Sequence, residues 1–349
     1  MRYNKLGRTD IRVSNICLGT MTWGEQNSQA EAREQMDYAV DQGVNFFDTA
    51  ELYPVPRKRE TFGRTEEFMG NWFSARGGRD KIILGTKVVG RSDADWFRQH
   101  ANITRLNRQQ ICEALDNSLR RLKTDYIDLY QLHWPDRPMN LFSGSRGYDH
   151  HDAADSIPLA ETLEVLDDLV KEGKIRHVGL SNETAWGVMK CLHHGEQENL
   201  PRVQSIQNAY NLLNRLFEQD LAEVSLREQV SLLAYSPLGG GSLSGKYLDG
   251  QLPIGSRQQL FPGFADRYTK PGVEQAILKY RALAAENGLT LVQLALKFID
   301  SRPFVTSSII GATTMDQLRE NIAAFEVTWN DELEQAVTEI HLENPDPAP

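Results

Sequence analysis

Four side chains that can move or steer a proton stand at the ends of short apolar segments. They are Asp48, Tyr53, Lys87 and His133, and together they comprise a carboxylate, a phenol, an amine and an imidazole. General acid–base catalysis uses these groups, because each can hold or release a proton when its surroundings adjust its pKa. The four residues therefore predict a site of proton transfer.

The chemistry that would use all four groups is the reduction of a carbonyl. Hydride addition leaves an alkoxide, which must receive a proton as it forms. A phenol, with a pKa of about 10, is a weak acid at neutral pH unless a cation stabilises its phenolate. Lys87 would supply that cation and Asp48 would hold the ammonium in its charged form. His133 would donate a hydrogen bond that orients and polarises the substrate carbonyl. This scheme requires no metal.

Each of these residues also has a simpler explanation when it is taken alone. Asp48 could cap a turn, and Tyr53 could be an ordinary loop aromatic. Lys87 could be solvated, and His133 could be a hydrogen-bonded core histidine. The combination favours the functional interpretation, because the four residues follow three successive predicted strands.

Short apolar or β-branched segments alternate with amphipathic ones through most of the chain. The predicted strands are Ile16–Leu18, Val44–Phe47, Lys81–Thr86, Ile127–Leu132, Ile175–Leu180, Ser205–Gln207, Ser231–Tyr235 and Ser307–Ile310. Eight strands that alternate with helices predict an α/β fold, a parallel sheet closed into a (β/α)8 TIM barrel. A doubly wound open sheet is the rival, but the first strand leads into Gly19–Gly24, which lacks the GxGxxG spacing.

We expect a single domain over residues 1–349. A β-hairpin at 2–14 would plug the bottom of the barrel, which would occupy residues 16–323. A C-terminal extension at 327–349 contains one more predicted helix, and its proline-rich tail is expected to be frayed. The carboxyl ends of barrel strands meet at one rim, so this fold would bring the four proton-handling residues together.

Composition narrows the possible functions. Of 349 residues, 40% are hydrophobic and 25% are charged, which is typical of a globular protein. The net charge of −10 argues against nucleic acid or an anionic membrane as a partner. The three cysteines form no CxxC pair, and no apolar run reaches about 18 residues. We therefore expect a cytoplasmic protein with no membrane contact, whose oligomeric state the sequence leaves open.

Five longer motifs carry more specific information. They are GVNFFDTAELY, ILGTKV, SLRRLKTDYIDLYQLHWP, GKIRHVGLSN and AYSPLGGGSLSGKY. In these motifs the chain resembles the aldo-keto reductase family, most of all its bacterial Tas-type NADP(H)-dependent members. The resemblance implies an oxidoreductase that reduces aldehydes or ketones to alcohols, with Tyr53 as the general acid. It also implies a catalytic tetrad made of Asp48, Tyr53, Lys87 and His133.

The resemblance further implies an NADP(H) site at the same rim. Ser181, Asn182 and Gln207 correspond to residues that bind the nicotinamide carboxamide, and Tyr235 corresponds to the aromatic that stacks on the ring. The full set of implied cofactor residues is Thr20, Met21, Gln26, Asp48, Ser181, Asn182, Gln207, Tyr235, Ser236, Pro237, Leu238, Gly239, Gly240, Gly241, Leu243, Lys246, Arg257, Gly311, Thr313, Gln317 and Asn321.

Arg257 is the candidate for the 2′-phosphate that distinguishes NADPH from NADH, because the planar guanidinium suits a phosphate group. Some relatives carry a basic residue directly after the eighth strand, where this chain has Gly311-Ala-Thr. The strength of the preference for NADPH therefore stays open.

The substrate pocket is predicted from aromatic residues near the rim, with Trp23 and Trp134 as the main candidates. Trp96, Phe142 and Tyr148 are further candidates. An aromatic lining favours an apolar or aromatic carbonyl compound over a free sugar.

Two other functions remain possible. Lys87 could form a Schiff base with a carbonyl substrate in a lyase. Alternatively, the chain could be a non-catalytic NADPH-binding regulatory or redox-sensing partner, like the family's potassium-channel subunits, which typically carry Asn in place of His133. The basic segment 57–59 is more typical of a solvated loop than of a guide for anionic substrates.

Overall fold

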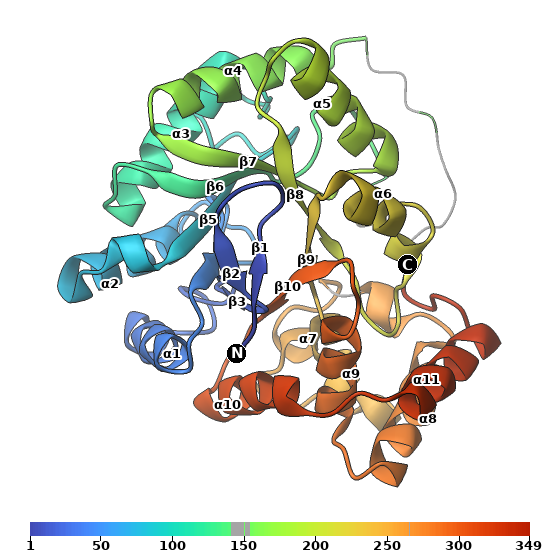
Figure 1. The fold of residues 1–349 in the computed structure, drawn as a ribbon. Helices are drawn as coiled ribbons and strands as arrows, with labels where there is room; N and C mark the ends of the chain where they lie inside the picture. The colour runs from blue at the N-terminus through green and yellow to red at the C-terminus, as the bar shows by residue number, and fades with distance from the viewer. Residues whose placement is uncertain (141–149, 151–153, 265) are drawn as a thin grey trace.

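Eight parallel strands close into a barrel in the computed structural model, which describes residues 1–140, 150, 154–264 and 266–349 (Figure 1). The barrel strands are β3 (Ile16–Gly19), β4 (Phe46–Asp48), β5 (Ile83–Val88), β6 (Ile127–Leu132), β7 (Ile175–Ser181), β8 (Val203–Ala209), β9 (Ser231–Tyr235) and β10 (Val305–Ile310). Their order is β10-β3-β4-β5-β6-β7-β8-β9, and β10 also pairs with β9, so the sheet has no open edge. The predicted TIM barrel is confirmed.

Helices surround the barrel on its outer side (Figure 1). The α-helices are α1 (Gln29–Asp41), α2 (Arg64–Arg76), α3 (Arg108–Leu122), α4 (Leu159–Lys171), α5 (Ala185–Gln197), α6 (Leu221–Glu228), α7 (Arg257–Leu260), α8 (Val273–Glu286), α9 (Leu291–Asp300), α10 (Met315–Ala323) and α11 (Asp331–Glu343). The 3₁₀ helices are η1 (Arg79–Lys81), η2 (Leu216–Glu218), η3 (Gly239–Ser244), η4 (Leu248–Gly250), η5 (Asp266–Thr269) and η6 (Ala324–Glu326). The connection between β9 and β10 is the most elaborate, since it contains α7, α8 and α9.

Helix α3 illustrates how local sequence fixes an element that positions the rim. The Asn107 side chain accepts a hydrogen bond from the backbone N–H of Gln110 at 3.1 Å, which caps the first turn. Ile111 and Leu115 are buried on the face that packs against the barrel. The helix ends at Leu122, and the next residue, Lys123, has a φ of 53° that turns the chain out of the helix and toward β6.

The N-terminal hairpin pairs β1 (Tyr3–Lys5) with β2 (Arg12–Ser14) in antiparallel register. Leu6 and Val13 are fully buried and form one apolar cluster with residues of β3, β4, β6, β9 and β10. The hairpin therefore covers the end of the barrel where the strands begin, as predicted (Figure 1).

The C-terminal extension contains α11, but the expectation of a frayed tail is wrong. The backbone N–H of Ala348 donates to the Leu213 carbonyl at 3.0 Å, and the Asp346 carboxylate accepts from the Arg215 N–H at 2.5 Å. Both tail residues are buried. The tail is ordered because it supplies partners for the backbone of the segment after β8.

Within the described residues, no single helix is long and apolar enough to span a membrane. The helices α8 and α9 meet the length and composition criteria only as a pair, and they are bent by 93°.

Candidate active site

A cleft of about 1100 Å³ opens at the rim where the barrel strands end. Asp48 ends β4, Tyr53 lies in the loop that follows it, and His133 directly follows β6. All three line the cleft. Lys87, in β5, lies beneath them with a fully buried side chain. The four predicted residues meet because β4, β5 and β6 are successive neighbours in the barrel.

Lys87 is held as a buried cation. Its Nζ donates to Asp48 Oδ2 at 2.5 Å and to the Thr49 carbonyl at 2.8 Å. Burial by itself lowers the pKa of Lys87, but the Asp48 charge and the interactions with Asp48 and Tyr53 raise it above its ordinary value. The side chain is therefore an ammonium at neutral pH.

The Tyr53 ring lies against this cation, with its centroid 4.9 Å from Lys87 Nζ. Burial raises the pKa of the Tyr53 phenol, and the Lys87 charge acts in the opposite direction. The phenol is thus protonated at neutral pH, and a cation lies next to it to stabilise the phenolate that forms when the proton leaves.

His133 is the neutral member of the set. Burial, and then the Lys87 charge, holds the pKa of its imidazole well below the usual range. Its ring stands nearly perpendicular to the Tyr53 ring, at 82° and 5.7 Å between centroids. Among the described residues, its buried Nδ1 has no hydrogen-bond partner. A neutral imidazole beside a phenol can hydrogen-bond to an uncharged oxygen atom in the cleft.

Two glutamine side chains fix the other oxygen of Asp48. Asp48 Oδ1 accepts from Gln131 Nε2 at 3.1 Å and from Gln207 Nε2 at 2.9 Å. Gln207 also donates to Gln131 Oε1 at 3.1 Å. Sequence reasoning missed Gln131. The available signal was its position in β6, two residues before His133 and so on the same inward face.

The amino-acid sequence of the chain also matches the model of a protein family. The family model described as "Aldo/keto reductase family" matches residues 15–341. The chain belongs to the aldo/keto reductase family. Its predicted resemblance to that family is confirmed, and the family makes it an oxidoreductase of a class that acts on small carbonyl compounds and generally uses NAD(P)H.

The relatives of this aldo/keto reductase include proteins of several kinds. "Protein tas" of Escherichia coli is 47% identical over 351 residues, which cover 100% of both chains. "Uncharacterized oxidoreductase YrpG" of Bacillus subtilis is 32% identical over 97% of this chain and 96% of its own length. "Probable voltage-gated potassium channel subunit beta" of Oryza sativa is 31% identical over 94% of this chain and 92% of its own length.

Most of the cofactor residues expected in this aldo/keto reductase line the same cleft. They are Thr20, Met21, Gln26, Asp48, Ser181, Asn182, Gln207, Tyr235, Ser236, Pro237, Leu238, Gly240, Gly241, Lys246, Arg257, Gly311, Thr313, Gln317 and Asn321. Gly239 and Leu243 do not line it. Both are buried, and their N–H groups donate to the Ser236 and Leu238 carbonyls, so they shape the loop from beneath.

At the tetrad end of the cleft, the polar side chains hold one another. Asn182 Nδ2 donates to the His133 carbonyl at 2.9 Å, and Asn182 Oδ1 accepts from the Tyr235 hydroxyl at 2.7 Å. The Ser181 hydroxyl donates to the Gln207 carbonyl at 2.8 Å. These bonds lock the ends of β7, β8 and β9 to the residue that presents the imidazole.

The loop after β9 has the geometry of an anion cradle. Gly240 and Gly241 have φ values of 64° and 102°, which L side chains rarely adopt. A Cβ on Gly241 would lie 3.0 Å from Lys246 Cε, so a glycine at this position avoids a steric clash with the Lys246 side chain in the cleft. Arg257 and Arg267 also line the cleft, and among the described residues neither has a carboxylate partner. Sequence reasoning did not identify Arg267.

The structure contradicts the placement of Trp23 in the substrate pocket. Its side chain is fully buried in the main apolar core, and its Nε1 donates to Gln35 Oε1 at 3.0 Å. The indole points away from the rim because α1 supplies an internal acceptor for its N–H. Trp96 does not line the cleft either, since it stacks on Phe97. Phe142 and Tyr148 lie outside the described residues.

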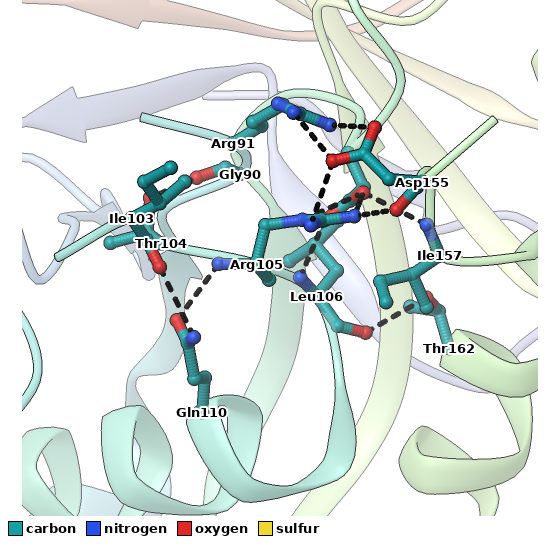
Figure 2. A network of polar contacts seen from close by, with 11 residues as sticks. Gly90, Arg91, Ile103, Thr104, Arg105, Leu106, Gln110, Asp155, Ile157 and Thr162 are labelled. Atoms are coloured by element: carbon teal, nitrogen blue, oxygen red, sulfur yellow. Dashed lines mark hydrogen bonds and ion pairs between the residues drawn. The ribbon is translucent and has the colours of Figure 1, made fainter. Parts of the chain in front are cut away.

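Trp134 does line the cleft, as predicted, and a polar network holds the wall to which it belongs. Its Nε1 donates to the Arg91 carbonyl at 2.8 Å. Figure 2 shows the Arg91 guanidinium facing the Asp155 carboxylate. Arg91 Nη1 donates to Asp155 Oδ1 at 3.0 Å, and Nη2 donates to Oδ2 at 2.8 Å. Arg105 contacts Asp155 as well and makes a bidentate pair with Asp136. The loops after β5 and β6 are thus joined into one wall beside Trp134.

Proposed function

We propose that this aldo/keto reductase uses NADPH to reduce aldehydes or ketones to alcohols, with Tyr53 as the general acid. The observation that carries the proposal is the phenol of Tyr53 lying against the buried Lys87 ammonium, whose charge is fixed by Asp48. An acid of this kind keeps its proton at neutral pH until negative charge develops on the substrate oxygen, and the phenolate then forms beside a cation.

The roles of the four residues follow from their surroundings. When bound, a reduced nicotinamide supplies the hydride. Tyr53 donates its hydroxyl proton to the carbonyl oxygen as negative charge develops there, and Lys87 stabilises the resulting phenolate. Asp48 keeps Lys87 in place and charged. His133 is neutral and hydrogen-bonds to the same substrate oxygen, which orients the carbonyl and polarises it.

The residues present fit a phosphorylated dinucleotide. The cleft extends from the tetrad to the loops after β9 and β10, and it is lined there by glycines of positive φ and by cations. Burial lowers the pKa of Arg257, and no described carboxylate neutralises its charge. A half-buried cation of this kind favours an anionic ligand such as a 2′-phosphate, and this supports NADPH over NADH.

The lyase alternative is weaker than the reductase proposal. A Schiff-base lysine must reach its substrate and lose its proton before it attacks. Lys87 has no exposed surface, its Nζ donates to Asp48 Oδ2 and to the Thr49 carbonyl, and its pKa is raised. These conditions suit a fixed cation and oppose a nucleophilic amine.

The test is to follow oxidation of NADPH with a panel of aromatic aldehydes, using wild type and Tyr53→Phe. We expect turnover in wild type and a loss of roughly 10³-fold in the variant, with NADPH affinity unchanged. Tyr3→Phe, at the opposite end of the barrel, is the control. Tight NADPH binding without turnover in wild type would favour the regulatory-partner alternative, and absence of NADPH binding would refute the cofactor assignment.

A further inference from the structure

The basic residues 57–59 differ sharply in their partners. Lys58 forms an ion pair with Glu25, and Arg59 forms one with Asp95 at 2.8 Å. Arg59 also lies over the Trp96 ring. The charges of these two residues are therefore balanced outside the catalytic cleft, as expected for a solvated loop.

Arg57 is the exception. It lines the cleft, and its Nη1 donates to the Ser92 hydroxyl at 3.1 Å. No carboxylate in the described part of the chain pairs with it. A serine hydroxyl positions the guanidinium without neutralising it, so a positive charge remains at the cleft.

Ser92, which accepts the hydrogen bond from Arg57, is itself held by further hydrogen bonds. Ser92 is buried, its carbonyl accepts from the Thr104 N–H at 2.8 Å, and its hydroxyl also accepts from the Ala94 N–H at 3.3 Å. The guanidinium is thus tethered to a fixed point of the wall, which lowers the entropy cost of holding it toward a ligand.

Arg57 lies on the substrate side of the cleft. It follows Tyr53 by four residues in the loop after β4, and Ser92 lies in the loop after β5. The expected phosphate-binding cations come from the connection after β9, and β9 lies opposite β5 in the barrel order. The substrate carbonyl must reach Tyr53, so a group on the far side of that substrate would meet Arg57.

The other charges on this side define what kind of group would bind. Arg91 lines the cleft, but Asp155 balances its charge. Asp93 also lines the cleft and is exposed. One unbalanced guanidinium with an acid nearby suits a singly charged carboxylate better than a doubly charged phosphate. The net charge of −10 repels anions elsewhere on the surface, so a local cation would be needed to admit one.

We propose that Arg57 binds a carboxylate of the substrate, so that the enzyme prefers carbonyl compounds that carry a carboxylate group on an apolar or aromatic body. This inference rests on the proposed reductase function. Trp134 lines the same cleft and would pack against the body of such a substrate.

The test compares 4-carboxybenzaldehyde with 4-formylbenzamide, which has nearly the same shape but no charge. Wild type should show a KM about tenfold lower for the acid than for the amide. Arg57→Gln should raise the KM for the acid about tenfold and leave the KM for the amide within about twofold. Arg59→Gln is the matched control, and it should change neither value because Asp95 already holds that charge.

Asp93→Asn provides a change of opposite sign. Removing the acid next to the site should lower the KM for 4-carboxybenzaldehyde by about threefold and leave the amide unaffected. Equal KM values for acid and amide in wild type, or an acid-to-amide ratio that Arg57→Gln leaves unchanged, would overturn the carboxylate site. A rise in the KM for NADPH in Arg57→Gln would instead assign Arg57 to the cofactor. If neither aldehyde is reduced, the proposed function itself fails.

Discussion

The two ends of the barrel use the same strands for opposite purposes. On β4, Phe46 packs with Leu6 and Val13 of the hairpin in a buried apolar cluster. Two residues later on the same inward face, Asp48 pairs with the buried Lys87. Inward positions recur every second residue, so one short strand contributes to both ends. The apolar end stabilises the barrel, and the polar end carries the groups that can transfer a proton.

The largest effect is expected at the polar end. Lys87→Met should lower turnover about 10³-fold, because Tyr53 loses the cation that stabilises its phenolate. The variant should also lose about 3–5 kcal/mol of unfolding free energy, since Asp48 is left buried without its cation. Steady-state kinetics and urea unfolding measure the two changes.

A second variant separates these two effects. Combining Asp48→Asn with Lys87→Met removes both charges, so most of the stability should return while turnover stays low. Recovery of turnover in the double variant would contradict the role of Lys87.

The next effect is at the apolar end. Leu6→Ala should lower the unfolding free energy by about 3 kcal/mol, because it leaves a cavity where the hairpin closes the barrel. The ratio kcat/KM should stay within about twofold at a temperature where the variant is folded. Leu342→Ala, on the exposed side of α11, is the matched control and should change neither quantity. A large loss of kcat in Leu6→Ala would show that the two ends are coupled.

A smaller effect is expected for Gln131, which acts through Asp48. Gln131→Met should lower kcat about tenfold, because Asp48 loses one of the two amides that orient it. The KM for NADPH should be unchanged. Gln197→Met, at the exposed end of α5, is the control. An effect on KM alone would mean that Gln131 contributes to binding and not to the positioning of Asp48.

The smallest effect concerns pH and His133. Burial holds its pKa below the ordinary value of 6.5, so below that pH the unfolded chain binds a proton that the folded protein does not. The contribution of neutral His133 to the unfolding free energy is therefore complete above pH 6.5, and it is lost as the pH falls from 6.5 toward the pKa of His133 in the folded protein. Between pH 7 and 5.5, wild type should lose about 1 kcal/mol more unfolding free energy than His133→Gln. Equal losses in the two proteins would indicate that His133 titrates normally.

Much of the fold could be predicted because its signals are local. The bounds of β6 and β9 agree with those predicted from runs of apolar residues. The second strand was placed too early, because the Val44 N–H still bonds to the Ala39 carbonyl at the end of α1 and the strand begins at Phe46. The fate of the C-terminal tail could not be predicted, since its partners Leu213 and Arg215 lie more than a hundred residues away in sequence.

The sequence was sufficient to place Asp48, Lys87 and His133 at one rim, since parallel barrel strands all end on the same side. Three-dimensional structure was required for relations that depend on distant partners. In the fold, the Trp23 indole N–H donates to Gln35 and is buried, and the Gln131 amide donates to Asp48. The tertiary contacts also distinguish Arg57 from its basic neighbours Lys58 and Arg59. Three adjacent charges look alike in sequence, but only their contacts with Glu25, Asp95 and Ser92 determine which one remains unbalanced at the cleft.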